Sequence, residues 1–422
     1  MQGHSIPLAA AAVAAVMAGS AVSAFACSAC GHTLPADYHT YLHDAPELLG
    51  DTVTTSATSS TVWLDFGLVS FRYSPAERLQ VLSAMQTLYS GFDISFSLTA
   101  PPVPAERIVF NNDGLGGVAS EIDFRNQSVG VAFVGTNDPG VLNTSAREVT
   151  YAARIGAHEL GHLLGLRHHD SQGPIGSGIF NFGGFFGWDT GPTFPGPRNA
   201  NLEGYRHIMT TPAVGASFNS FINPAVDMSF SERSLIKLTF NEQGVTYAEA
   251  PGNKGSIATA QAIDLVSMNV LNTLPGTFSN SGETFFVDAA AVTGRIASSG
   301  QQDFYAIDLD AGVQLTVEVM SEALGRITDD FDTTVGLFDG SGSLVSYYGS
   351  TAFNDDEFET LDSILLDVLI PETGTYYIRV AGFGSSTGDY EMFAYTFSTV
   401  PEPTSLAGIA LLTLGLVRRR RA

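Results

Sequence analysis

Residues 158–168 read HELGHLLGLRH. His158 and His162 are four residues apart, so on a helix both imidazoles project from one face and can reach one metal ion. Gly165 lets the chain leave this helix in a left-handed or open turn, which brings His168 back as a third ligand. Three neutral histidines leave a fourth position for water, so the segment predicts a catalytic rather than a structural zinc site.

Glu159 follows the first histidine directly. A carboxylate there can take a proton from the activated water and later deliver it to the leaving amine. The long pattern HExxHxxGxxH rarely arises by chance, whereas HExxH alone does so more often. We therefore expect a zinc metalloendopeptidase that acts on polypeptide substrates, with Glu159 as general base.

The segment resembles the zinc motif of the metzincin peptidases, of the reprolysin-like or matrixin-like kind. The resemblance implies an α+β catalytic domain with a mixed twisted sheet and an active-site helix. It also implies that Met209, within HIMT at residues 207–210, packs beneath the ligands without binding the metal. The alternative is an ordinary core methionine in a turn.

Two departures from the family pattern leave open which metzincin subfamily the motif resembles. In reprolysin-like members an aspartate follows the third histidine, but here His169 separates His168 from Asp170. Asp170 either holds the ligand turn or is a surface carboxylate. His169 is an alternative third ligand, although the spacing from Gly165 favours His168. Some metzincins carry a tyrosine two residues after the methionine, where this chain has Thr211, and we assign no role to Tyr205.

Local signals place these residues on helices and strands. Capping boxes at 74–77 (SPAE) and 145–148 (SARE) predict helix starts, and the second opens the helix with the zinc motif. Strands are expected at 94–98, 107–110 and 129–134.

An aromatic, glycine-rich segment, residues 179–188, lies between the third histidine and Met209. The family resemblance implies that this span forms the wall of the pocket for the residue after the scissile bond. We therefore expect an apolar or aromatic preference there, and the alternative is hydrophobic filling of the core.

The chain changes character near residue 250, where a Pro-Gly pair at 251–252 marks a linker. Short alternating segments follow, and they predict an all-β sandwich or jelly roll. We expect a metzincin-like zinc peptidase domain at 61–248 and the β domain at 252–398. The expected strands include 304–309, 313–319, 334–338, 364–369 and 375–380.

Several motifs in this half resemble the bacterial prepeptidase C-terminal domain: QDFY at 302–305, GTYYIRV at 374–380 and GDY at 388–390. The same half carries acidic clusters at 329–332 and 354–357, which offer the oxygen ligands that Ca²⁺ prefers. They make Ca²⁺ a second candidate cofactor, and solvated loops are the alternative.

Charge also limits the function. With 43 acidic and 19 basic side chains, the formal net charge is -24, which disfavours nucleic acid and anionic membranes as partners. The length suggests two folded domains.

The ends predict export. Residues 1–26 carry no Asp, Glu, Lys or Arg and contain the apolar run 8–22, which indicates a signal peptide. Residues 27–60 would then be a propeptide or an N-terminal extension. Cys27 and Cys30 are expected to form a local disulfide or a loose pair. They could instead bind metal with His32, His39 and His43, or one thiolate could occupy the zinc in a latent precursor.

Residues 400–422 comprise VPEP, an apolar stretch at 404–417 and Arg418–Arg421. This arrangement resembles the PEP-CTERM sorting tail of Gram-negative bacteria. The resemblance implies transient inner-membrane anchoring, cleavage by an exosortase-type enzyme, and a cell-surface or extracellular destination. The arginines would remain on the cytoplasmic side.

Two other functions compete with the peptidase. One is an inactive surface or matrix-associated adhesion or scaffold protein that keeps a zinc-binding fold, but intact ligands and Glu159 favour an enzyme. The other is a different zinc enzyme with a distant glutamate ligand, which Gly165 and His168 disfavour.

Overall fold

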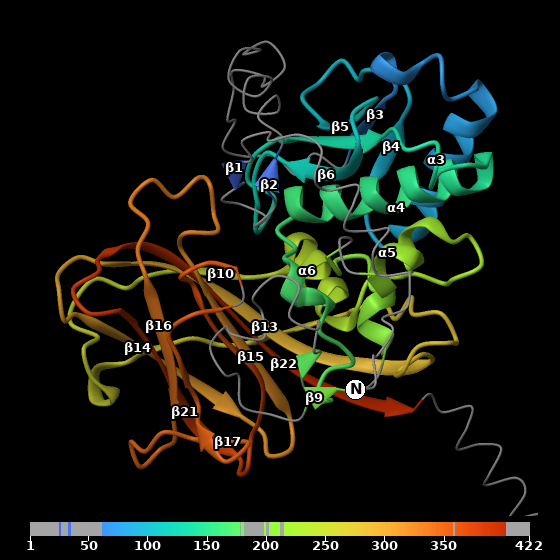
Figure 1. Cartoon of the computed structure of the whole chain (residues 1–422). Coiled ribbons are helices and arrows are strands. Elements are labelled where there is room, and N and C mark those ends of the chain that lie inside the picture. The colour runs from blue at the N-terminus through green and yellow to red at the C-terminus, as the bar shows by residue number, and fades with distance from the viewer. Residues whose placement is uncertain are drawn as a thin grey trace, which may run out of the picture.

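A computed structural model describes the chain as a mixed α/β region followed by a β-rich region (Figure 1). Both were expected in this order. The structure describes residues 25–26, 33–34, 61–177, 179–180, 198–199, 202–211, 215–357 and 359–401.

The first region is built on a mixed five-stranded sheet with the strand order β4-β3-β5-β7-β6. Its strands are β3 (Thr61–Asp65), β4 (Ser95–Ser97), β5 (Glu106–Asn111), β6 (Leu115–Ala119) and β7 (Val131–Thr136). All neighbours pair in parallel except β6, which runs antiparallel to β7 at the edge of the sheet. The predicted strands 94–98, 107–110 and 129–134 correspond to β4, β5 and β7.

Among the described residues, four helices accompany this sheet: α3 (Pro75–Leu88), α4 (Ser145–Leu163), α5 (Gly215–Ile222) and α6 (Glu232–Gln243). The capping box that starts α3 is confirmed, since Ser74 and Glu77 cap each other's backbone N–H groups. The predicted cap of α4 is wrong by one residue. Thr144 accepts the hydrogen bond from the Arg147 N–H, whereas the Ser145 hydroxyl donates to Glu77 on α3.

The second region is a sandwich of two sheets. One sheet contains β10 (Thr246–Ala248), β12 (Val266–Met268), β13 (Glu283–Ile296), β15 (Gln314–Met320), β20 (Ser363–Leu369) and β22 (Gly388–Pro401). The other contains β11 (Gln261–Ala262), β14 (Gln302–Leu309), β16 (Thr333–Phe338), β19 (Phe353–Asn354) and β21 (Gly374–Gly382). The remaining strands form two-stranded pairs: β1 (Phe25–Ala26) with β2 (Thr33–Leu34), β8 (Ile179–Phe180) with β9 (Arg198–Asn199), and β17 (Ser346–Tyr347) with β18 (Ser350–Thr351).

One of the two hydrophobic clusters among the described residues spans both regions. Side chains alternate along a strand, and β22 is buried on both faces: Met392 and Ala394 point into the sandwich, whereas Phe393 and Tyr395 belong to the core of the α/β region. The Phe393 ring lies 4.8 Å from that of Phe240 on α6, between ring centroids. Figure 1 shows α6 between α4 and the sandwich sheet. The β10 strand joins that sheet before the linker expected at 251–252.

Within the part of the chain that the structure describes, no helix is long and apolar enough to cross a membrane. The predicted signal peptide, except β1, and the predicted membrane segment at 404–417 lie outside the described residues.

Candidate metal centre

Three histidines converge at the end of α4 in the arrangement that the motif predicts. The Nε2 atom of His158 lies 3.2 Å from that of His162 and 3.2 Å from that of His168. All three side chains are buried. Among the described residues, no other group of three or more His, Cys, Asp or Glu side chains could hold a metal ion.

A second hydrogen bond orients each ring. Nδ1–H of His158 donates to the carbonyl of Ile208 (2.7 Å), and Nδ1–H of His162 donates to the carbonyl of Leu166 (2.9 Å). In this tautomer each ring presents its Nε2 lone pair to the point where the three Nε2 atoms converge. In the same tautomer, Nδ1–H of His168 donates to Oε1 of Glu359. Such partners fix the ring orientation and the tautomer of metal-binding histidines.

This donor set fits zinc. Tetrahedral zinc with Zn–N bonds of about 2.0–2.1 Å requires ligand nitrogens about 3.3 Å apart, close to the separations found here. Burial, with a contribution from Arg167, lowers the pKa of His168 to about 3. The ring is therefore neutral at physiological pH and its Nε2 lone pair is available to a cation.

Glu159 lies beside the three histidines and is fully buried. Its Oε1 atom is 4.0 Å from Nε2 of His158. The edge strand β6 passes directly against it, because a Cβ atom added at Gly117 would lie 2.3 Å from Oε1 of Glu159. Only glycine allows the backbone to approach the carboxylate this closely.

The turn after α4 depends on Gly165, which has a φ of +85°. A Cβ atom there would lie 2.4 Å from Cα of Phe124. Both the backbone conformation and the space therefore require glycine.

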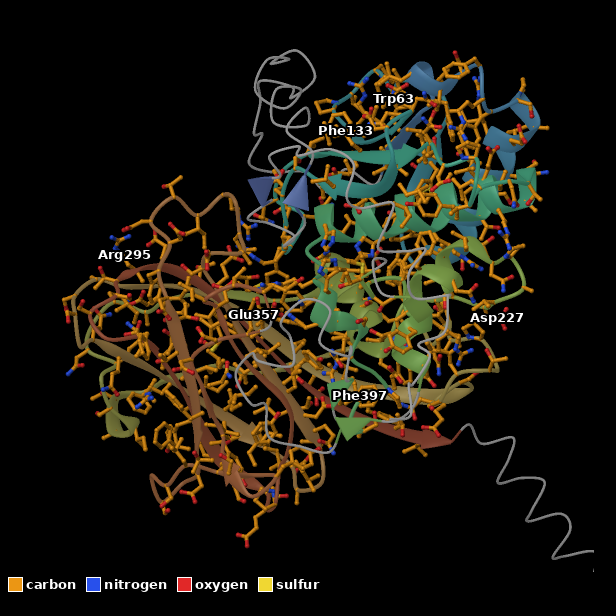
Figure 2. All side chains as sticks on the ribbon, viewed as in Figure 1. Trp63, Phe133, Asp227, Arg295, Glu357 and Phe397 are labelled. Atoms are coloured by element: carbon orange, nitrogen blue, oxygen red, sulfur yellow. The ribbon has the colours of Figure 1, made fainter. Side chains whose placement is uncertain are left out.

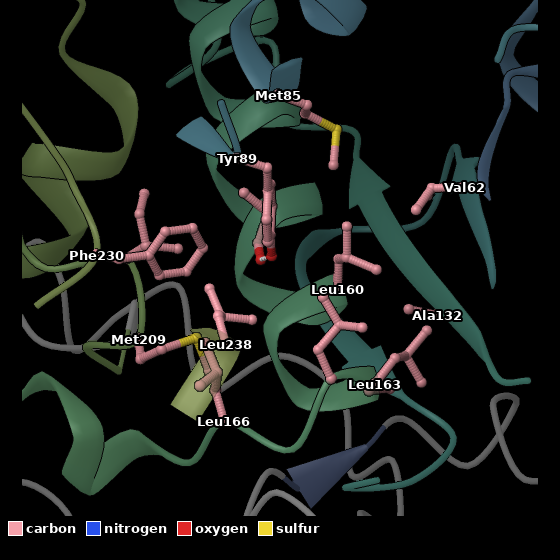
Figure 3. Close-up of a cluster of buried hydrophobic side chains, with 14 of the residues drawn as sticks. Val62, Met85, Tyr89, Ala132, Leu160, Leu163, Leu166, Met209, Phe230 and Leu238 are labelled. Carbon is pink, nitrogen blue, oxygen red and sulfur yellow. Dashed lines mark hydrogen bonds between the residues drawn. The ribbon is translucent and has the colours of Figure 1, made fainter. Parts of the chain in front are cut away.

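Met209 packs against α4 at Gly161, the residue before His162. It is fully buried, and a Cβ atom at Gly161 would lie 2.5 Å from its sulfur. Figure 3 shows Met209 packed beside Leu166 and Leu238. The adjoining carbonyl of Ile208 orients His158, so this turn supports the first ligand through its backbone.

Asp170 is a buried residue that holds the ligand turn, so it is not a surface carboxylate. Its Oδ2 atom accepts hydrogen bonds from the backbone N–H of Arg167 (2.7 Å) and from Nζ of Lys237 (3.0 Å).

His169, the alternative third ligand, lies outside the histidine cluster. Its Nε2 and Nδ1 atoms lie 3.2 Å from Glu318 and 3.4 Å from Glu357. Burial lowers the pKa of His169, but Glu318 and Asp170 outweigh burial and raise it to about 9. A protonated imidazole is not a metal ligand, so the structure places His168 rather than His169 at the centre.

Arg167 inserts into an acidic site on the β-rich region. Its guanidinium is fully buried, pairs with Glu357, and lies 3.1 Å from Asp362 and 3.7 Å from Glu318. Burial raises the pKa of Glu357, but Arg167 and His169 outweigh burial and hold it below its usual value. Figure 2 shows Glu357 where the two regions meet.

Sequence reasoning missed these contributors from the β-rich region: Glu318, Glu357, Glu359 and Asp362. Glu318 lies on β15 and the other three acids share one later loop, all 150 or more positions beyond the motif, and no local pattern links them to the histidines. The only signal was Arg167 itself, a charged residue inside a motif whose neighbours are buried.

The calcium prediction is not supported. Glu357, in one of the two acidic clusters, pairs with Arg167 and His169, and Asp329 in the other pairs with Arg295. Among the described residues, neither cluster brings three His, Cys, Asp or Glu side chains close enough together to hold one metal ion. Cys27, Cys30 and residues 181–188 lie outside the described residues.

Comparison with known proteins assigns part of the β-rich region. Residues 301–382 match the bacterial pre-peptidase C-terminal domain, which confirms the resemblance over that stretch. No curated protein matches the chain.

Solved structures with local similarity to this chain include a collagenase C-terminal domain and a zinc protease. The pre-peptidase C-terminal domain of a Bacillus anthracis collagenase is 14% identical, covering 35% of this chain and 99% of that one, with a TM-score of 0.21. The zinc-protease hatching enzyme HCE-1 of Oryzias latipes is 16% identical, covering 44% and 90%, with a TM-score of 0.23. Myroilysin is 20% identical, covering 37% and 80%, with a TM-score of 0.22.

Proposed function

We propose that this protein is an exported zinc-dependent metalloendopeptidase. The observation that carries the proposal is the convergence of three buried histidines, in which Nε2 of His162 and Nε2 of His168 each lie 3.2 Å from Nε2 of His158, with Glu159 beside them. His158, His162 and His168 would hold the metal through Nε2. Zinc, when bound, supplies a Lewis acid that activates water and polarises the scissile carbonyl.

Glu159 would act as general base and then as general acid. Its burial beside the metal site lets it take a proton from the attacking water and return it to the leaving amine. Asp170, Gly165 and Met209 would support the site without touching substrate.

The edge strand β6 offers a place for an extended polypeptide. It is one of the two edge strands of the sheet among the described strands, and it passes Glu159 at Gly117. A peptide that adds to such an edge is held by backbone hydrogen bonds largely independent of its sequence. The apolar preference assigned to residues 179–188 remains a prediction for cleavage profiling with a peptide library.

Export and surface delivery complete the proposal. The uncharged apolar N-terminus supports a signal peptide, and the tail at 400–422 supports transient inner-membrane anchoring and cleavage by an exosortase-type enzyme. Deleting Arg418–Arg421 is expected to abolish surface retention in a Gram-negative host that carries the processing enzyme. Unchanged fractionation would refute the tail assignment.

The activity test compares the full chain with its Glu159→Ala variant in casein hydrolysis, before and after zinc removal. We expect bound zinc in both proteins but hydrolysis by the wild type alone, lost on chelation and restored by zinc. Equal hydrolysis by both would refute the role of Glu159. Zinc without hydrolysis in either would favour the scaffold alternative.

A further inference from the structure

The β-rich region contacts the third histidine, whereas the α/β region itself supports the other two. The acceptors for His158 and His162 are the backbone carbonyls of Ile208 and Leu166, both in the α/β region. The acceptor for His168 is the carboxylate of Glu359, which lies 191 residues further along the chain. One third of the hydrogen-bonded support of the metal site therefore comes from the sandwich.

The same loop of the sandwich also holds the residue before His168. Arg167 Nη1 lies 3.1 Å from Asp362 Oδ2, and Nη2 contacts Glu357 and lies 3.1 Å from Thr360 Oγ1. The Arg167 side chain has no exposure to solvent. A buried guanidinium bound at several points fixes the backbone from which His168 projects.

The described residues of this acidic loop, 357 and 359–362, are held in place by their own region. Glu357 Oε1 accepts from the N–H groups of Glu359 (2.9 Å) and Thr360 (2.6 Å). Asp362 accepts from the N–H groups of Ser321 (2.7 Å) and Glu322 (2.9 Å). The carboxylates are therefore positioned independently of Arg167, as a preorganised site requires.

Ion pairs near the loop also join the sandwich to α6 and to the ligand turn. Lys237 on α6 bridges Asp170 of the ligand turn, at 3.0 Å, and Glu318 on β15, at 2.6 Å. Arg233 on the same helix pairs with Asp367 on β20 at 2.6 Å. Both lysine and arginine are buried, so separating the regions would expose unpaired charges and apolar surface together.

We infer that the β-rich region is a working part of the metal centre, in which Glu359 is a positioning residue that orients His168 for zinc. The inference rests on the proposed zinc site. It implies that the region remains attached in the active protein rather than acting as a removable appendage.

The test uses full-length Glu359→Ala and Glu359→Gln, with Glu372→Ala as the matched control. Glu372 is an exposed acid of the same region. The first readout is zinc affinity, measured by competition with a chromophoric chelator. The second is the visible absorption spectrum of the Co²⁺-substituted protein, which reports ligand geometry.

Loss of an outer-shell partner weakens metal binding about 10- to 100-fold. We expect that loss and an altered cobalt spectrum in Glu359→Ala. Glu359→Gln should recover part of the affinity, because its amide oxygen can accept the same hydrogen bond. The metal-free Ala variant should melt close to the wild type, and Glu372→Ala should match the wild type throughout.

A second comparison separates orientation of His168 from a general structural effect. In a His168→Ala background, Glu359→Ala should weaken zinc no further, because the ring it orients is gone. Wild-type zinc affinity in Glu359→Ala, or an equal loss in both backgrounds, would overturn the inference and leave the proposed function standing. A wild-type chain that binds no zinc would overturn the proposed function itself.

Discussion

Replacement of Phe393 by alanine tests whether the α/β region and the sandwich unfold as one unit. Phe393 lies on β22 and is fully buried, with its ring centroid 5.1 Å from that of Phe124 and 4.8 Å from that of Phe240. Removing a buried phenylalanine ring costs about 3–5 kcal/mol, because apolar burial is lost and a cavity remains.

The shift in melting temperature distinguishes one unit from two. An unfolding entropy of about 2.1 cal/mol/K per residue gives roughly 0.7 kcal/mol/K for a unit of about 340 residues, so a loss of about 4 kcal/mol lowers the Tm by about 6 °C. A sandwich of about 150 residues that unfolds alone would drop by about 13 °C.

Differential scanning calorimetry of the full chain measures this shift. We expect a single transition that moves as a whole. Phe286→Ala, an exposed phenylalanine (52%) on the neighbouring strand β13, is the control and should change the Tm little. The shared core would be refuted by two separate transitions, with Phe393→Ala lowering the Tm of only one of them, by about 13 °C.

Two further substitutions test the site. Arg167→Met should destabilise the full chain by about 3–5 kcal/mol in denaturant unfolding, because it leaves buried carboxylates without their cation. The control, Arg295→Met, removes an exposed ion pair and should have little effect. Equal losses of unfolding free energy in the two variants would contradict the buried network. Gly117→Ala should lower kcat/KM for a peptide about 100-fold with zinc retained, because the new methyl group displaces Glu159. The control is Gly114→Ala, where an added Cβ meets nothing within 4 Å, and this variant should retain activity. Wild-type kinetics in Gly117→Ala would refute the close approach of β6 to Glu159.

The parts of the fold that the sequence predicted are those governed by local rules. Serine, proline and glutamate at 74–77 specify a helix start by themselves. Sandwich strands such as β15 show an alternation of apolar and polar residues in the sequence itself. The start of α4 shifted by one residue because Ser145 bonds instead to Glu77, a tertiary contact that no local pattern contains.

Strand β6 was missed for a functional reason. Its residues include Gly116 and Gly117, which lower strand propensity, yet glycine is required where the strand passes Glu159. Propensity therefore fails at the candidate site itself.

The histidine cluster was predictable because its spacing lies within one helix and one turn. The acids that hold Arg167 and His168 were not, because their contacts join positions 190 and 191 residues apart. Such contacts depend on how the two regions pack, and the packing is not encoded in any short motif.

The most direct test of the zinc centre is X-ray absorption at the zinc edge on the full-length protein, combined with its zinc content. The account predicts one zinc per chain, with three imidazole nitrogens and one oxygen at about 2.0–2.1 Å. The imidazole signal should fall to two in His168→Ala. A protein that binds no zinc, or a first shell with fewer than three imidazoles in the wild type, would contradict the account.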